Sequence, residues 1–219
     1  FELDPFQPGR MTLKLDNSDR RFDPLHASGP YFGKLLPRKR TRLQADWGAY
    51  LNLTGASTSG AFTPDAAALD ITGDLDLRCR VSGDWTPATD STLVAKGNLL
   101  GQFSYSLALL TTGVLRMAWS TAGTLGSILT TDSTAAVGAA DGEIRWVRAT
   151  LDVDAGGGNR AVRFYTSSDD THDHTAVSWT QLGSTVTTAG TTSVFSGSAV
   201  ASVGILADGS APFTGRIYA

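Results

Sequence analysis

The chain of 219 residues is poor in the residue types that build disulfide scaffolds and acid–base sites. It has one cysteine, Cys79, which excludes an intrachain disulfide and the disulfide frameworks of small secreted domains. Its only glutamates, Glu2 and Glu143, lie on different segments. Glycoside hydrolysis needs two carboxyl groups about 5 to 9.5 Å apart, and no pair of neighbouring glutamates is present to supply them.

Aspartates and serines do not replace the missing catalytic groups. Asp152 and Asp154 would share a strand face, but they lie at the mouth of an expected turn, where exposed aspartates are ordinary. No Gly-x-Ser-x-Gly motif occurs and the chain has only three histidines, so a Ser-His-Asp triad has little support. We therefore predict that the protein is not an enzyme.

Long apolar runs are also absent, and none reaches the roughly 18 to 20 residues that span a bilayer. No signal peptide precedes Phe1 and no initiator methionine is present, so we expect an excerpt of a longer protein. The formal net charge of −3 at pH 7 is too weak to indicate a nucleic-acid partner. We expect neither a membrane span nor nucleic-acid binding.

The charge is unevenly distributed along the chain. Residues 1–46 carry nine Lys/Arg and six Asp/Glu, whereas residues 47–219 carry nine and fifteen. This difference predicts a domain boundary between a small β-rich N-terminal segment, 1–46, and a larger domain, 47–219. The N-terminal segment would hold two strands and a long irregular loop, which would be marginally stable alone.

The basic side chains of the N-terminal segment cluster on its second expected strand, at Arg38, Lys39, Arg40 and Arg42. One interpretation is a solvated edge strand, where charge discourages aggregation between sheets. The other is a contact to an acidic neighbouring subunit. Nucleic acid is disfavoured because no aromatic residues interleave with the cluster.

The chain does have regular alternation of apolar and polar residues, most clearly between residues 143 and 167. Apolar side chains fall on one face of the first half of this stretch, at Val147, Ala149, Leu151 and Val153. Asp154 to Asn159 then include three glycines, which favour a reversal. A second alternating run follows, so we predict an antiparallel hairpin whose apolar face must be covered by a second sheet.

The rest of the larger domain shows the same strand-and-turn character. Further strands are expected over 75–82, 91–96, 103–110, 113–120, 175–180, 198–206 and 212–218. Cys79 falls on the apolar side of its strand and should be a small core residue. The only helical candidate spans residues 63–69, capped by Thr63, and segment 121–142 is expected to be a loop with one short strand. This pattern predicts an all-β, antiparallel β-sandwich.

Two features are candidates for binding a ligand. Polar residues cluster between Ser168 and His174, and this cluster contains Asp169, Asp170, His172 and Asp173. Its aspartates could contribute to a calcium site and its histidines to a zinc site, but a solvated hairpin loop is the favoured interpretation; we predict no bound metal and leave calcium open. Trp85 follows a strand in a loop and is the best candidate for an aromatic platform that stacks on a sugar, although ordinary packing is the favoured interpretation of this side chain.

Several stretches resemble a known family. FTPDAAALDITGDLDLRCRV, WVRATLDVD with the following AGGGNRAVRFYTSSDD, SWTQLGSTVT and FTGRIYA resemble the concanavalin A-like, laminin-G-like lectin domains of minor tail proteins from long-tailed actinobacterial phages. GRMTLKLDNSDRRFDP and GPYFGKLLPRKRTRLQA are similar to the N-terminal module of those proteins. The linker between the two modules is shorter here than the family pattern suggests.

The resemblance implies a concanavalin A-like jelly roll in a structural protein of a virion, made in the cytoplasm of the host bacterium. Its lectin-like domain would serve adhesion to a host cell-wall glycan or contacts with other tail subunits, in a homo-oligomer at the tail tip. Two alternatives belong to other classes: a carbohydrate-binding module of a larger glycoside hydrolase, and a cell-surface adhesion domain.

Overall fold

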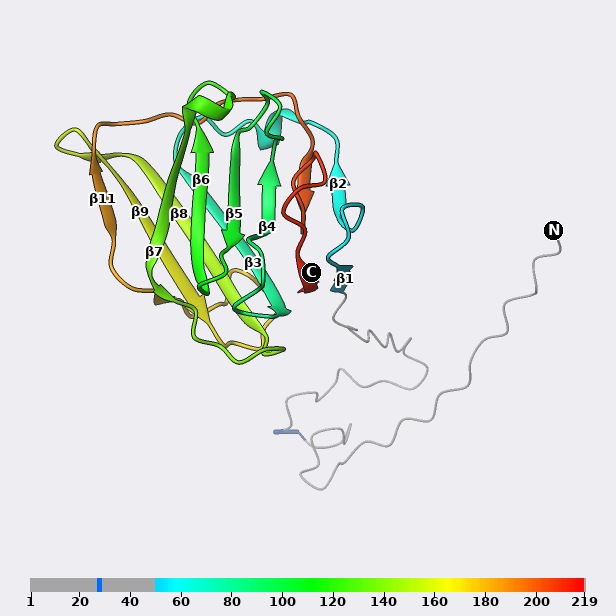
Figure 1. Ribbon diagram of the computed structural model, residues 1–219. Helices are drawn as coiled ribbons and strands as arrows, with labels where there is room; N and C mark the ends of the chain where they lie inside the picture. Colours follow the sequence, from blue (N-terminus) through cyan, green and yellow to red (C-terminus); the bar gives the residue numbers. More distant parts are fainter. Residues whose placement is uncertain (1–26, 29–49, 219) are drawn as a thin grey trace, which may run out of the picture. The chain divides into compact units, whose positions relative to one another are not determined.

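The computed structural model describes residues 27–28 and 50–218, and residues 50–218 form two layers of antiparallel strands (Figure 1). One sheet has the order β1-β13-β3-β8-β9-β10, with β11 also paired to β9. Its strands are β1 (Tyr50–Thr54), β3 (Leu75–Gly83), β8 (Arg145–Gly156), β9 (Asn159–Ser167), β10 (Thr180–Gln181), β11 (Val186–Ala189) and β13 (Thr214–Tyr218).

The second sheet has six strands in the order β2-β12-β4-β5-β6-β7. They are β2 (Ala61–Thr63), β4 (Ser91–Lys96), β5 (Tyr105–Leu109), β6 (Val114–Ser120), β7 (Ile128–Ala136) and β12 (Ala201–Val203). The predicted all-β, antiparallel sandwich is therefore confirmed. The predicted boundary at residue 46 and the basic cluster Arg38, Lys39, Arg40 and Arg42 lie outside the described residues.

The predicted hairpin around residues 143–167 is the longest strand pair of the domain. β8 and β9 pair antiparallel, with Leu151 opposite Val162. The reversal uses Gly156, Gly157 and Gly158, all at positive φ, a conformation that costs glycine little because it has no Cβ. The alternation in the sequence therefore sets both the strand face and the register.

The apolar face of the β8–β9 hairpin is covered by the six-stranded sheet, as its hydrophobicity requires. The hairpin contributes four buried side chains to the core between the sheets: Val147, Ala149, Leu151 and Phe164. The six-stranded sheet contributes Leu107, Leu115 and Met117 to the same core. Figure 1 shows β5 and β6 lying in front of β8 and β9. Cys79 is a buried member of the same core, as predicted, and burial raises the pKa of its thiol to about 12.

One sequence-based prediction of an element is incomplete and another is wrong. Segment 121–142, expected to be a loop with one short strand, contains a strand of nine residues, β7, whose weak apolar pattern reflects its half-exposed position at the edge of the sheet. Residues 175–179, expected to begin a strand, lie in a loop. There Asp173 Oδ1 accepts a hydrogen bond from the Thr175 backbone N–H, and Asp169 Oδ2 accepts one from Ser178 N–H, which turns the chain locally.

The helical candidate at 63–69 is reduced to a single 3-10 turn, Ala67–Leu69. Thr63 ends β2 instead of capping this turn. Among the described residues, no helix has the length and apolarity needed to cross a membrane.

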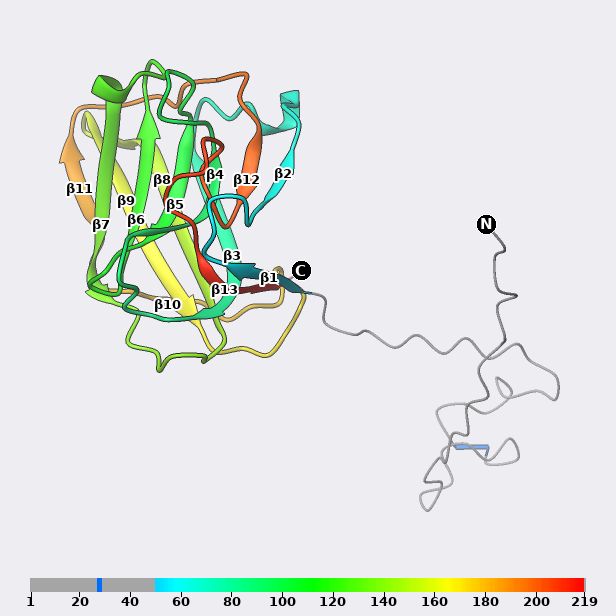
Figure 2. The ribbon, with the colours of Figure 1, turned by 45° about the vertical axis from the view of Figure 1, so that its right-hand side comes forward.

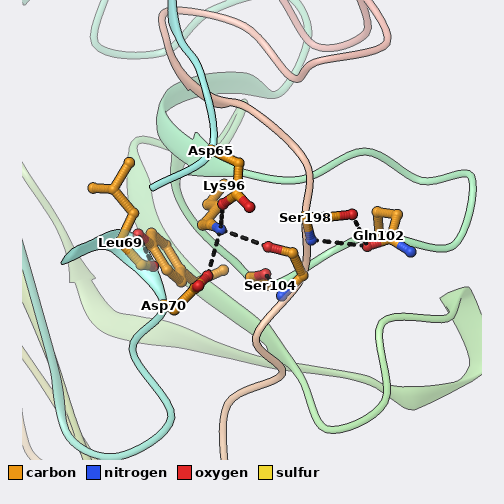
Figure 3. Close-up of polar contacts among 9 residues, drawn as sticks. Asp65, Leu69, Asp70, Lys96, Gln102, Ser104 and Ser198 are labelled. Carbon is orange, nitrogen blue, oxygen red and sulfur yellow. Dashed lines mark hydrogen bonds and ion pairs between the residues drawn. The ribbon is translucent and has the colours of Figure 1, made fainter. Parts of the chain in front are cut away.

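A buried ammonium group ties this 3-10 segment to the second sheet (Figure 3). Lys96, at the end of β4, is fully buried, and its Nζ lies 2.5 Å from Asp65 Oδ1 and 2.8 Å from Asp70 Oδ1. It also donates to the Gly197 carbonyl at 2.6 Å. The side chains of Asp65 and Asp70 keep about a third of their surface exposed, so the pairing joins a buried cation to two solvated carboxylates.

Candidate functional site

The outer face of the seven-stranded sheet gathers arginine and aromatic side chains. The pairing places Arg80 of β3 between Trp146 of β8 and Tyr218 of β13. Two residues along the strands, on the same face, Arg78 lies opposite Arg148 of β8. Arg148 in turn lies opposite Tyr165 of β9. Because side chains alternate along a strand, these residues project away from the core. With Trp179 from the adjoining loop, we call this surface the arginine–aromatic face: Arg78, Arg80, Trp146, Arg148, Tyr165, Trp179 and Tyr218.

The arginines of this face stack on the aromatic rings. The guanidinium carbon of Arg148 lies 5.0 Å from the ring centre of Tyr165 and 5.5 Å from that of Trp179. Arg80 lies 5.1 Å from the ring of Tyr218. Such contacts attract a cation to the π-face and hold the planar guanidinium flat. The face is thus a set of ordered hydrogen-bond donors beside apolar rings.

Asp76 is the carboxylate that holds two of these arginines in place. Its oxygens accept two hydrogen bonds from Arg78, at 3.0 and 2.6 Å, and two from Arg148, at 3.0 and 2.8 Å. Partial burial alone would raise the pKa of Asp76, but the hydrogen bonds and positive charges of Arg78 and Arg148 outweigh it, so the pKa lies below the ordinary 3.8.

This lowered pKa predicts an acid-sensitive contribution to stability. The contribution is present above about pH 3.8 and is lost as the pH falls through the lower pKa of the folded state. The melting temperature of the Asp76→Asn variant should therefore fall less steeply than that of the wild type between about pH 5 and 2. Thermal unfolding followed by circular dichroism measures this, with Asp154→Asn in the exposed hairpin turn as the control; parallel curves for wild type and Asp76→Asn would contradict it.

The loop between β9 and β10 closes one end of the face. Trp146 Nε1 donates to the Thr171 carbonyl at 3.1 Å, and the rings of Trp146 and Trp179 meet edge to face with centres 6.1 Å apart. Arg80 Nη2 forms an ion pair with Asp170, and Arg80 Nη1 lies 3.4 Å from the ring nitrogens of His172. Figure 2 shows β13 and β1 side by side at the edge of this sheet.

An open cavity of about 610 Å³ lies at this end of the face. Its polar lining comes mainly from Asp76, Arg78, Arg80, His172 and His174. Its apolar lining includes Trp146 and Tyr218 on the outer face, and Cys79, Val94, Val203 and Ile217 from the interior between the sheets, so only part of this volume opens on the face. Guanidinium donors next to aromatic rings suit a ligand that offers both acceptor oxygens and apolar ring faces. Sugars have both.

The structure separates the residues of the predicted polar cluster. Asp170 and His172 reach the arginine–aromatic face through Arg80. Asp169 and Asp173 instead accept hydrogen bonds from Ser178 and Thr175 and so hold the loop in shape. Across residues 27–28 and 50–218, no three His, Cys, Asp or Glu side chains come together to hold a metal ion, so the calcium hypothesis gains no support.

Trp85 is not a surface platform, which corrects its prediction as a ligand-binding residue. It is 2% exposed and belongs to the core between the sheets. Its Nε1 donates to the Glu143 carbonyl at 3.1 Å and its backbone N–H donates to Asp141. The sequence placed Trp85 in a loop, and loop residues are usually at the surface, but this loop folds back over the end of the sandwich.

The residues that define the arginine–aromatic face were not predicted from the sequence. Arg78 and Arg80 are two residues apart on β3, as are Trp146 and Arg148 on β8. A spacing of two puts both members of each pair on the same face, and that was the available signal. Their meeting across strands depended on a pairing between β3 and β8 that the sequence did not specify.

Comparisons with known proteins found distant similarities among solved structures only. No family model and no curated protein matches the chain. Among solved structures, the chain is similar to the CBM40 carbohydrate-binding module of the Ruminococcus gnavus IT-sialidase bound to alpha2,3 sialyllactose, with 14% identity and a TM-score of 0.48 over 80% of this chain and 86% of that one. It is also similar to a heptameric SAP-like pentraxin from Limulus polyphemus, with 12% identity and a TM-score of 0.42 over 73% and 72%.

Proposed function

We propose that residues 50–218 form a non-catalytic module that binds glycans through the arginine–aromatic face. The observation that carries this proposal is the union, on one exposed sheet face, of ordered guanidinium donors and half-buried aromatic rings beside a cavity of about 610 Å³. Hydroxyl and acidic oxygens of a sugar would accept from the arginines, and its ring face would pack on Trp179 or Tyr218.

The biological setting we propose is the tail tip of a long-tailed phage, where the module would bind the host cell wall. The support for this setting is the resemblance of both parts of the sequence to minor tail proteins. Weak individual sites would suffice there, because repeated copies at a symmetric tail tip raise the overall avidity. Tape-measure and tail-assembly genes beside this gene would support the setting, whereas a hydrolase domain in the same reading frame would overturn it in favour of a hydrolase-attached module.

Binding to wall material tests the function itself. The full chain should sediment with isolated actinobacterial cell walls, and Arg148→Ala should weaken this binding about tenfold, because a charge-assisted hydrogen bond contributes about 1.5–3 kcal/mol and 1.4 kcal/mol is a factor of ten. Sedimentation with increasing amounts of wall material measures the affinity.

The matched control is Arg116→Ala. Arg116 lies on the opposite sheet and forms an equivalent two-bond contact with Asp132, at 2.6 and 2.8 Å. It should leave wall binding unchanged. Equal losses in both variants would show that binding depends on total charge and not on this face, and no sedimentation of the wild type would overturn glycan binding.

A further inference from the structure

Three arginine–carboxylate contacts of the described domain share a side-on geometry that the buried Arg80, like the more exposed Arg145, lacks. Arg78 and Arg148 each use Nε and Nη2, the two donors on one edge of the guanidinium, to grip the two oxygens of Asp76. Arg116 grips Asp132 with the same two atoms. This side-on arrangement satisfies both donors at once and is the strong form of the contact.

Arg80 makes only half of that contact. Its Nη2 bonds to one oxygen of Asp170, whereas the neighbouring Nε has no hydrogen-bond partner among the described residues. The side chain of Arg80 is 4% exposed, so bulk water has little access to this donor. A buried donor without an acceptor costs free energy, and the missing acceptor lies on the edge that a carboxylate would occupy.

The group that now occupies this edge is itself exposed to solvent. The side chain of Asp170 is 93% exposed and belongs to the loop between β9 and β10. Asp170 can therefore move into water, whereas the buried guanidinium of Arg80 needs another anion in its place. Arg80 also lines the cavity of about 610 Å³, with Trp146 and Tyr218 beside it.

We propose that this edge of Arg80 is a subsite for the carboxylate of an acidic sugar, and that Asp170 is an internal stand-in for that carboxylate. An incoming carboxylate displaces Asp170 and accepts from both Nε and Nη2, which completes the contact that Asp170 leaves half made. The sugar ring then lies in the cavity against Trp146 and Tyr218. This inference rests on the proposed glycan binding and names its ligand class as uronic-acid-type sugars.

Removing the internal competitor tests the proposal. In the full chain, Asp170→Asn should bind sodium glucuronate about threefold to tenfold more tightly than the wild type. The reason is that glucuronate no longer competes with the Asp170 carboxylate for Arg80. The uncharged analogue glucuronamide should show no such gain. The affinity and the site are both read from the ¹H–¹⁵N resonance of the Arg80 Nε–H, which should shift as a partner is acquired.

Two variants serve as controls. Asp132→Asn changes the net charge equally but frees Arg116 on the other sheet, so it should not raise the affinity for glucuronate. Arg80→Lys keeps the charge and removes the two-donor edge, so it should abolish the gain when combined with Asp170→Asn. Because Arg80 is buried, the melting temperature of each variant is recorded, and Asp170→Asn, whose side chain is exposed, keeps the test valid if Arg80→Lys does not fold.

The outcomes separate this inference from the proposed function. Cell walls whose carboxyl groups have been reduced to alcohols should lose most of their binding. If they bind as well as untreated walls, glycan binding stands and the carboxylate subsite is overturned. Suppose that glucuronate shifts the Arg80 resonance and binds Asp170→Asn more tightly than the wild type, but intact walls are not bound. The subsite then stands and the wall-binding function is overturned. An unshifted Arg80 resonance, or equal affinity in wild type and Asp170→Asn, overturns the subsite.

Discussion

Leaving the buried Lys96 ammonium without a carboxylate is expected to lower the free energy of unfolding by about 3–5 kcal/mol. The variant that does this carries Asp65→Asn and Asp70→Asn together. Lys96 is fully buried, and its remaining partners would be neutral: the Gly197 carbonyl at 2.6 Å and the amide oxygens of the two asparagines. A charge removed from water is poorly compensated without an opposite charge.

The reverse substitution should be milder. Lys96→Met leaves two carboxylates, but their side chains are already 35% and 31% exposed and can take up water. We expect Lys96→Met to cost less than the double aspartate variant, and each single aspartate variant to cost less than the double because one carboxylate remains. Urea unfolding of the full chain measures these differences, with Asp84→Asn/Asp154→Asn as a control for the change in net charge. A loss below about 1 kcal/mol in the double variant would contradict the expected cost of a stranded ammonium.

The pKa values around Lys96 agree with this account. Burial alone would lower the pKa of Lys96, but the hydrogen bonds and charges of Asp65 and Asp70 outweigh it and raise the pKa above 10.5. The hydrogen bond from Lys96 lowers the pKa of Asp70 below 3.8. The lysine therefore contributes stability that is present below about pH 10.5 and is lost as the pH rises through its higher folded value.

The fold was largely predictable because its strongest signals are local. The β8–β9 hairpin combines strict alternation with a run of glycines, and each residue's face follows from a period of two. The bounds and length of β7 could not be predicted because an edge strand with one half-exposed face needs no regular apolar pattern. Lys96 is polar in an otherwise apolar strand, and its burial depends on Asp65 and Asp70, which lie 31 and 26 residues away.

The candidate site was predictable only in part for the same reason. Asp170 and His172 stood out as a local polar cluster, and they do contact the arginine–aromatic face. Their partner, Arg80, lies 90 residues from Asp170 in the sequence. A pattern within one segment shows which residue types are available, but only the pairing of β3, β8 and β13 brings the arginines and aromatic rings together.

Replacing Trp85 and Trp179 with alanine, one at a time, should separate the effect on stability from the effect on binding. Trp85→Ala removes a side chain that is 2% exposed and its hydrogen bond to Glu143, so the free energy of unfolding should fall by about 3–5 kcal/mol. Trp179→Ala removes a half-buried ring that contacts Trp146 and Arg148, so stability should change less while cell-wall binding weakens. Chemical unfolding and wall sedimentation of both variants measure the two effects. If Trp85→Ala left stability unchanged but abolished binding, Trp85 would be a ligand platform after all, and the arginine–aromatic face would not be the site.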